Sequence, residues 1–128
     1  MVKFTATVSD PVMRLTMCLL HSVTNGHILH LSTNSYSKHK ALETFYTEIG
    51  GHADDFIEAF QGKYGLLTKY TDNFELATDP IEYITYVADE IETLRKAQGF
   101  PQDTYLQNIL DEMLKLVYST LYKLKFLN

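Results

Sequence analysis

Between Gly26 and Gly62, six of the histidine and carboxylate side chains are spaced as metal ligands on a helix would be. They form three pairs whose members are three or four residues apart: His27 and His30, His39 and Glu43, and Asp54 and Glu58. Residues at this spacing lie on one face of an α-helix, so each pair can direct two ligands toward one point. Imidazole and carboxylate together suit iron or another first-row metal such as zinc. The spacing therefore predicts a metal site in this stretch.

Helices are the elements expected to hold these pairs. Asp10-Pro11 and Asp79-Pro80 each place an N-cap residue before a proline, which marks a helix start. Apolar periodicity predicts four amphipathic helices, over about 11–31, 36–62, 80–99 and 103–124. No segment alternates as a strand would. We therefore expect an all-α, ferritin-like four-helix bundle in a single domain over residues 1–128. Residues 63–78 form a long connection between helices 2 and 3, expected to run over one end of the bundle.

The first predicted helix carries its histidines on the apolar face. Its apolar stripe begins at Val12 and reaches Val23 in steps of three and four, and the same steps lead to His27 and His30. Both histidines are therefore expected to face inward. Three polar residues are expected on other faces, namely Ser22, Thr24 and Asn25.

The second predicted helix cannot close one site alone if it is straight. His39, Glu43, Asp54 and Glu58 lie within an arc of roughly 100°. His39 and Asp54 are fifteen residues apart, which is roughly 22 Å along the axis. The two pairs meet only if a second copy lies antiparallel across a two-fold axis, giving two symmetric sites per dimer. Alternatively, Gly50-Gly51 breaks the helix and the pairs close within one chain.

The order and intervals of these residues resemble the ferroxidase-centre motif of the Dps proteins, the mini-ferritins of starved bacteria. The matching pattern is His27-x11-His39-x3-Glu43-x10-Asp54-x3-Glu58. The resemblance implies an iron-binding protein that oxidises Fe²⁺ to Fe³⁺ with peroxide or oxygen. His27, His39 and Glu43 would come from one chain, and Asp54 and Glu58 from its mate. It also implies a homo-oligomer, at least a dimer and by analogy a dodecamer.

The chain departs from the Dps pattern at several points. Glu43 stands where that family usually has Asp, and Ile28 replaces a tryptophan. A basic N-terminal tail is absent, and His30 competes with His27 for the first ligand position. The segment LHLSTNSYSKHKAL also resembles small phage-encoded relatives of the fold.

Composition limits the partners and the compartment. The net charge of −5 argues against DNA binding, which needs a basic surface. No apolar stretch is long enough to cross a membrane. Cys18, the single cysteine, lies in an apolar run and is expected to be a buried thiol in a reducing compartment. A cytoplasmic location follows, in a host cell if the chain is phage-encoded.

An alternative hypothesis is that the chain kept the helical-bundle fold but has no catalytic activity. The chain would then be a catalytically silent helical bundle that serves as a structural or interaction protein. No nucleophile–base pair, glycine-rich phosphate loop or CxxC motif supports another enzyme class. His21 and His52 receive no role, and Tyr36 and Tyr46 are the tyrosines nearest the candidate ligands.

Overall fold

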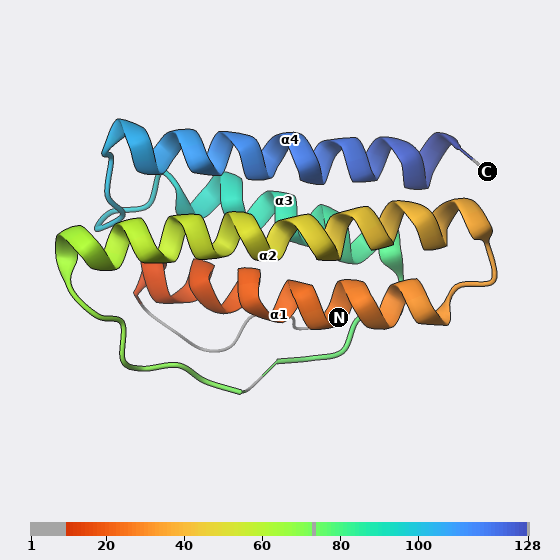
Figure 1. Ribbon diagram of the computed structural model, residues 1–128, viewed down its shortest axis with the longest axis horizontal. Helices are drawn as coiled ribbons and strands as arrows, with labels where there is room; N and C mark the ends of the chain where they lie inside the picture. Colours follow the sequence, from red (N-terminus) through yellow and green to blue (C-terminus); the bar gives the residue numbers. More distant parts are fainter. Residues whose placement is uncertain (1–9, 73, 128) are drawn as a thin grey trace.

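Four helices lie side by side in the computed structural model, which describes residues 10–72 and 74–127. They are α1 (Pro11–Ser32), α2 (Tyr36–Tyr64), α3 (Pro80–Leu94) and α4 (Thr104–Phe126). Helices α1 and α4 run in one direction, and α2 and α3 run in the other (Figure 1). Both α1 and α4 pack on α2 and on α3. The predicted four-helix bundle is confirmed, with the one long connection between α2 and α3 that characterises the ferritin-like order.

The helix starts follow the capping signals of the sequence. Asp10 accepts a hydrogen bond from the Val12 N–H at 2.9 Å, and Asp79 accepts from the backbone N–H of Ile81 and Glu82. Asp103 precedes α4 but gives no side-chain cap, because its carboxylate accepts from Lys63 and Tyr64 of α2 instead. These bonds fasten the end of α2 to the start of α4.

Helix α3 ends at Leu94, five residues before the predicted end at Gly99. The side chains of Gln102 and Gln107 both donate to the carbonyl oxygen of Arg95, at 2.9 and 3.1 Å. In a longer helix, the Arg95 carbonyl would accept a hydrogen bond from a backbone N–H of the next turn. The chain therefore leaves α3 early and turns back through Gly99, whose φ is 89°.

Helix α2 is continuous through Gly50 and Gly51. An added Cβ at Gly50 would lie 3.6 Å from Val23, and one at Gly51 would meet nothing within 4 Å. Since neither glycine interrupts the backbone, the alternative in which a broken α2 closes the site within one chain is wrong.

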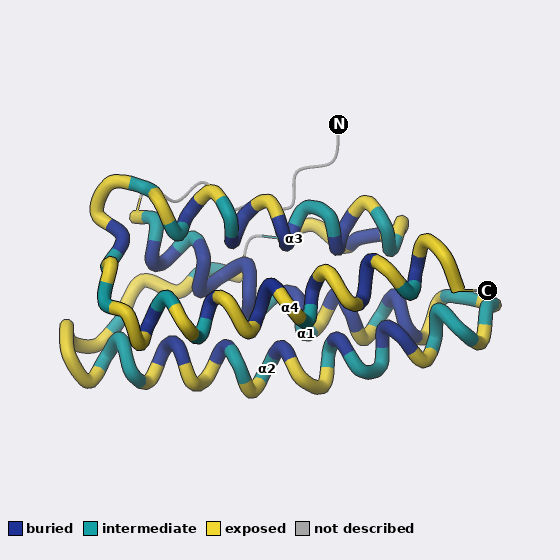
Figure 2. The backbone as a smooth tube through the Cα atoms, turned by 90° about the horizontal axis from the view of Figure 1, so that it is seen from above, coloured by how far each residue is buried: buried dark blue, intermediate teal, exposed yellow. Residues whose placement is uncertain are grey.

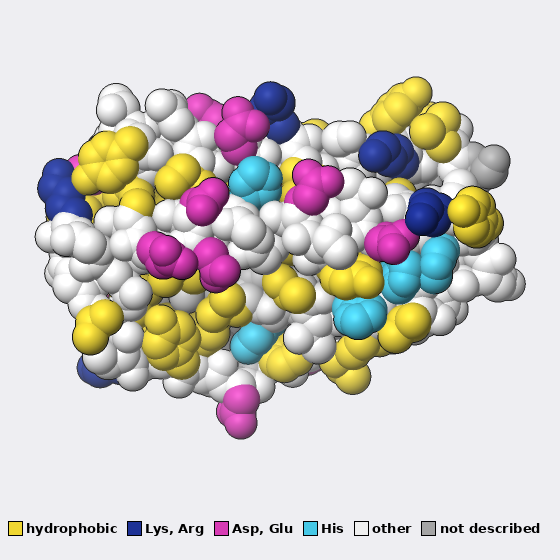
Figure 3. Space-filling model, in the orientation of Figure 1, with side chains coloured by type: hydrophobic (Ala, Val, Ile, Leu, Met, Phe, Trp, Pro, Cys, Tyr) yellow, Lys and Arg dark blue, Asp and Glu magenta, His cyan; other side chains and the backbone are white. Residues whose placement is uncertain are grey.

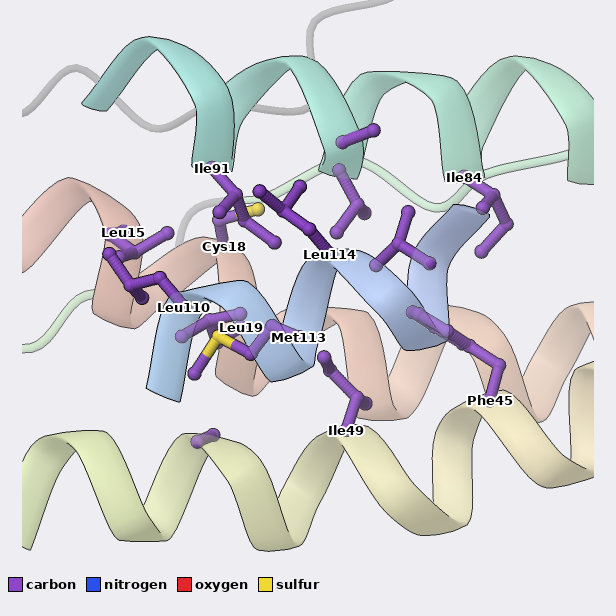
Figure 4. Close-up of a cluster of buried hydrophobic side chains, with 14 of the residues drawn as sticks. Leu15, Cys18, Leu19, Phe45, Ile49, Ile84, Ile91, Leu110, Met113 and Leu114 are labelled. Atoms are coloured by element: carbon purple, nitrogen blue, oxygen red, sulfur yellow. The ribbon is translucent and has the colours of Figure 1, made fainter. Parts of the chain in front are cut away.

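The core fills the space between the four helices along their whole length (Figures 2 and 4). Phe45 and Ile49 of α2 meet Leu19 of α1, together with α3 and α4 side chains such as Ile84 and Met113. Cys18 is buried as expected, and burial raises the pKa of its thiol well above the ordinary range. None of the described helices is long and apolar enough to span a bilayer.

The predicted inner face of α1 is correct in its first half, whereas in the second half it is correct for His30 and Thr24 and wrong for His27, Ser22 and Asn25. His30 is buried, but His27 is exposed, whereas Ser22 and Asn25 are buried. Asn25 accepts a hydrogen bond from the N–H of Ala77 and donates to the carbonyl of Glu75. The Asn25 side chain can be buried here because it forms hydrogen bonds with backbone groups of the non-helical segment that connects α2 to α3.

That segment, described over residues 65–72 and 74–79, runs along α1 and not over one end of the bundle as predicted (Figure 1). The Thr71 N–H donates to the Met17 sulfur at 3.1 Å, and the Phe74 ring lies 3.9 Å from the ring of His21. With the Asn25 bonds, these contacts hold the segment at three successive turns of α1.

Acidification is expected to weaken this attachment. Burial lowers the pKa of His21, although Thr71 and Asp72 act in the opposite direction. The unfolded chain therefore binds the proton first, and stability falls as the pH drops through about 6.5. His21→Phe keeps an aromatic ring beside Phe74 and removes the titration. Urea unfolding at pH 7.5 and 5.5 should show a smaller pH-dependent loss in the variant. Equal losses in the two proteins would show that His21 is not responsible.

Candidate metal centre

His30 and His39 form a reciprocal pair across the turn between α1 and α2. The Nδ1 of His30 lies 2.7 Å from the carbonyl oxygen of His39, and the Nδ1 of His39 lies 2.9 Å from the carbonyl oxygen of His30. Their rings stack with centroids 3.7 Å apart. Ser35 caps α2 between them, so both imidazoles sit at well-defined helix ends.

The hydrogen bonds decide the tautomer of each ring. A carbonyl oxygen can only accept, so each Nδ1 must carry the proton and donate it. In a neutral ring, Nε2 is then the atom whose lone pair can take a proton or bind a metal. Metal-binding histidines commonly donate their other ring N–H to a carbonyl in this way, because the bond fixes the ring and raises its basicity. In each ring, Nε2 is therefore the atom left available to a metal.

His27 lies beside this pair but is held differently. It is exposed, and its ring stacks on Tyr46 of α2 with centroids 4.3 Å apart and an interplanar angle of 9°. Tyr46 also contacts His30, at 5.3 Å between centroids. The three histidines and Tyr46 thus form one aromatic cluster at the end of the bundle where α1 meets α2 (Figure 3).

Glu43 is the carboxylate nearest this cluster. Its Oε1 lies 2.8 Å from the Nζ of Lys40, one turn earlier on α2. The hydrogen bond and charge of Lys40 lower the pKa of Glu43, and His30 and His39 are close enough to add to the effect. Glu43 is therefore a carboxylate at neutral pH, and any metal that it binds must compete with Lys40.

Asp54 and Glu58 do not join the cluster. Both are exposed on α2, and because the helix is continuous they lie more than two turns beyond Glu43. Within residues 10–72 and 74–127, no three His, Cys, Asp or Glu side chains are close enough to hold a metal ion. One protomer thus brings only His30 and His39 into direct contact, with Glu43 nearby at the same end of α2, and it places the Asp54–Glu58 pair farther along the helix.

Sequence reasoning missed the features that define the cluster. The paired Nδ1–carbonyl bonds and the stacking of His27 on Tyr46 depend on how α1 and α2 pack. Gly26 is the signal that could have indicated this packing. An added Cβ there would lie 2.9 Å from both Phe45 and Tyr46, so glycine is required for the close approach of the two helices.

Residues 30–124 match the model of a family described as a family of unknown function, DUF5856. The chain belongs to this family. The match begins at His30 and covers the rest of the turn, all of α2, α3 and most of α4.

A similar protein is known from a phage. The "uncharacterized 14.6 kDa protein in mobD-ri intergenic region" of Enterobacteria phage T4 is 29% identical over 102 residues, covering 77% of this chain and 75% of that protein. The expected likeness to phage-encoded proteins is thereby confirmed. No solved structure matches the chain significantly.

Proposed function

We propose that this chain binds a first-row transition metal, with iron the best fit, at sites shared between two copies, and that it oxidises Fe(II) there. The observation that carries the proposal is the reciprocal hydrogen bonding of His30 and His39 through Nδ1, which leaves the Nε2 atom of each ring available in the neighbourhood of the Glu43 carboxylate. This nitrogen and oxygen donor set suits iron, and zinc as a second choice. The Dps-like spacing supports the same chemistry.

Two copies are needed because α2 is straight. The pairs His39–Glu43 and Asp54–Glu58 are placed symmetrically about the midpoint between Glu48 and Ile49. An antiparallel second α2 crossing at that point would set His39 opposite Glu58 of the other copy, and Glu43 opposite its Asp54. The exposed, side-chain-free Gly51 lies near the crossing and would permit close approach of the two helices.

His30 is the better first ligand of the two histidines left open by the sequence. Its Nδ1 bond orients the ring, whereas the ring of His27 stacks on Tyr46. In the proposed site, His30 and His39 hold the metal, and Glu43 with the two carboxylates of the other copy neutralises it. Bound iron would supply the redox chemistry, with oxygen or peroxide accepting the electron.

Metal titration tests the proposal. Isothermal titration with Fe(II) under anaerobic conditions, or with Zn(II), should show one site per chain in the wild type. His39→Ala and Glu58→Ala should each weaken binding at least tenfold. His52→Ala is the matched control, because His52 is an α2 histidine outside the cluster, and it should bind normally. Fe(II) oxidation, followed by absorbance, should fall in the same two variants.

Mixing the two defective variants tests whether the site is shared. A heterodimer of His39→Ala with Glu58→Ala contains one site with both defects and one site with neither. Mixed and re-equilibrated samples should therefore regain up to a quarter of the wild-type sites, given random pairing. Metal binding that is equal in the wild type, His39→Ala and Glu58→Ala would refute the proposal.

A silent structural bundle is the second candidate. It is favoured by the fact that no three metal-binding side chains converge within the described part of one protomer. The His30–His39 bonds would then serve only to lock the α1–α2 turn. In that case His39→Ala would lower stability while leaving metal binding unchanged.

A further inference from the structure

We propose that the outer face of the second half of α4 is a contact surface for a second copy of this chain, packed antiparallel. This surface lies on a different helix from the candidate metal centre and does not depend on the proposed function. Three aromatic side chains define it at successive turns: Tyr118, Tyr122 and Phe126 are 47%, 55% and 69% exposed. The rings of Tyr122 and Phe126 lie 6.0 Å apart.

Helix α4 leaves this face open. It packs on α2 and α3, and its far side faces outward along its whole length (Figure 2). A solvated helix face is normally polar, and this one carries an exposed aromatic ring at three consecutive turns. The Tyr118 hydroxyl donates to Glu92 of α3 at 3.1 Å, and Tyr118 is nonetheless 47% exposed. Exposed aromatic side chains that form one stripe are typical of protein interfaces.

Charge on α4 is segregated along its length. Residues 97–114 contain no Lys or Arg, whereas residues 113–128 contain no Asp or Glu. The exposed acids of the first half are Asp111 and Glu112, and lysines 115, 123 and 125 are the bases of the second half. The helix dipole favours this order of signs, but it does not require the aromatic stripe, which lies within the basic half.

The separation of acidic and basic side chains along α4 favours a second copy of this chain as the partner of the aromatic face. It also determines the relative direction of the two α4 helices. A parallel pair of α4 helices would place like charges together, whereas an antiparallel pair places the acidic half of each on the basic half of the other. With the two-fold axis at Tyr118, Glu112 faces Lys123 of the second copy and Asp111 faces its Lys125. Lys115 then lies against the Tyr122 ring of the second copy, where a cation–π contact is favourable.

The ion pairs that the α4 side chains form within one protomer do not prevent these side chains from contacting a second copy. Asp111 accepts from Arg95 at 2.8 Å, yet its side chain remains 55% exposed. Glu112 and Lys115 are 3.4 Å apart, in an exposed pair one turn apart that contributes little. Glu112 can therefore meet a second chain freely, and the half-exposed Asp111 can do so while it keeps its bond to the Arg95 side chain, which is only 17% exposed.

Cysteine cross-linking of the full chain tests the axis. Ser119→Cys lies one residue from the proposed two-fold axis and should form a disulfide-linked dimer under mild oxidation. Asn108→Cys is the matched control on the same exposed face. Ten residues from the axis, it lies about 30 Å from its equivalent in the second copy and should not cross-link. The buried Cys18 keeps the wild type as a negative control.

Charge exchange tests the register. Lys123→Glu alone and Glu112→Lys alone should each raise the dissociation constant of α4-mediated association about five- to tenfold, measured by sedimentation equilibrium. The double variant Glu112→Lys with Lys123→Glu should restore the dissociation constant of the wild type. Cross-linking of both cysteine variants would indicate a parallel pair and overturn the proposal, and so would cross-linking of neither, because the face would then serve another partner. Metal binding should be unchanged in all these variants, so failure here is distinct from failure of the proposed metal site.

Discussion

Arg14→Met is expected to lower the free energy of unfolding by about 3 kcal/mol. Glu90 of α3 is buried, and Arg14 of α1 donates to both of its oxygens, from Nε at 2.9 Å and from Nη2 at 2.6 Å. Removing the guanidinium would leave a carboxylate in the α1–α3 interface with no cation beside it. The expected loss is at the lower end of the range for buried pairs, because the Arg14 side chain is 36% exposed.

The double variant Arg14→Met with Glu90→Leu separates the cost of the orphaned charge from the value of the pair. Replacing both partners by apolar side chains removes the buried charge, so most of the lost stability should return. Urea unfolding at pH 7 measures all of these proteins. A double variant that is no more stable than Arg14→Met would show that Arg14 acts through packing and not through Glu90.

Gly26→Ala is expected to destabilise the protein by about 1–3 kcal/mol, even though alanine favours a helix by roughly 1 kcal/mol over glycine. The new Cβ would lie 2.9 Å from the Cβ of Tyr46 and from Cδ2 of Phe45. The Phe45 ring is fully buried and the Tyr46 Cβ is fixed to the α2 backbone, so the two helices must move apart. That movement would also separate the stacked rings of His27 and Tyr46.

Gly51→Ala is the control for helix propensity. Gly51 is in the interior of α2, is exposed, and has open space around its Cβ position. In the isolated protomer, at concentrations too low for two copies to associate, alanine there should raise the free energy of unfolding by about 0.5–1 kcal/mol. Thermal or urea unfolding would show opposite signs for the two substitutions. Stabilisation by Gly26→Ala would mean that the α1–α2 contact is looser than described.

The helices and their order were predictable because the signals for them are local. The dipeptides Asp10-Pro11 and Asp79-Pro80 set two helix starts through bonds that span two or three residues. Apolar periodicity then gave the core face of α2 and α4. The long connection between α2 and α3 was predictable for the same reason, as a stretch without periodicity.

The path of that connection was not predictable from the sequence. For the same reason, the buried face of the second half of α1 was predicted incorrectly. Asn25 reads as a polar, outward residue until the backbone of Glu75 and Ala77 is placed beside it. Likewise, the end of α3 depends on Gln102 and Gln107 reaching the Arg95 carbonyl. Polar side chains that satisfy distant backbone groups carry no periodic signal.

The sequence by itself determined which metal-binding side chains exist, their helical spacing, and the conclusion that a straight α2 divides them into two groups. These properties follow from composition and from the fixed rise of a helix. Only the tertiary structure decided that α2 is straight, that His30 and not His27 is paired with His39, and that both rings present Nε2. Those outcomes depend on the close approach at Gly26 and on carbonyl groups at the α1–α2 turn, which no residue spacing specifies.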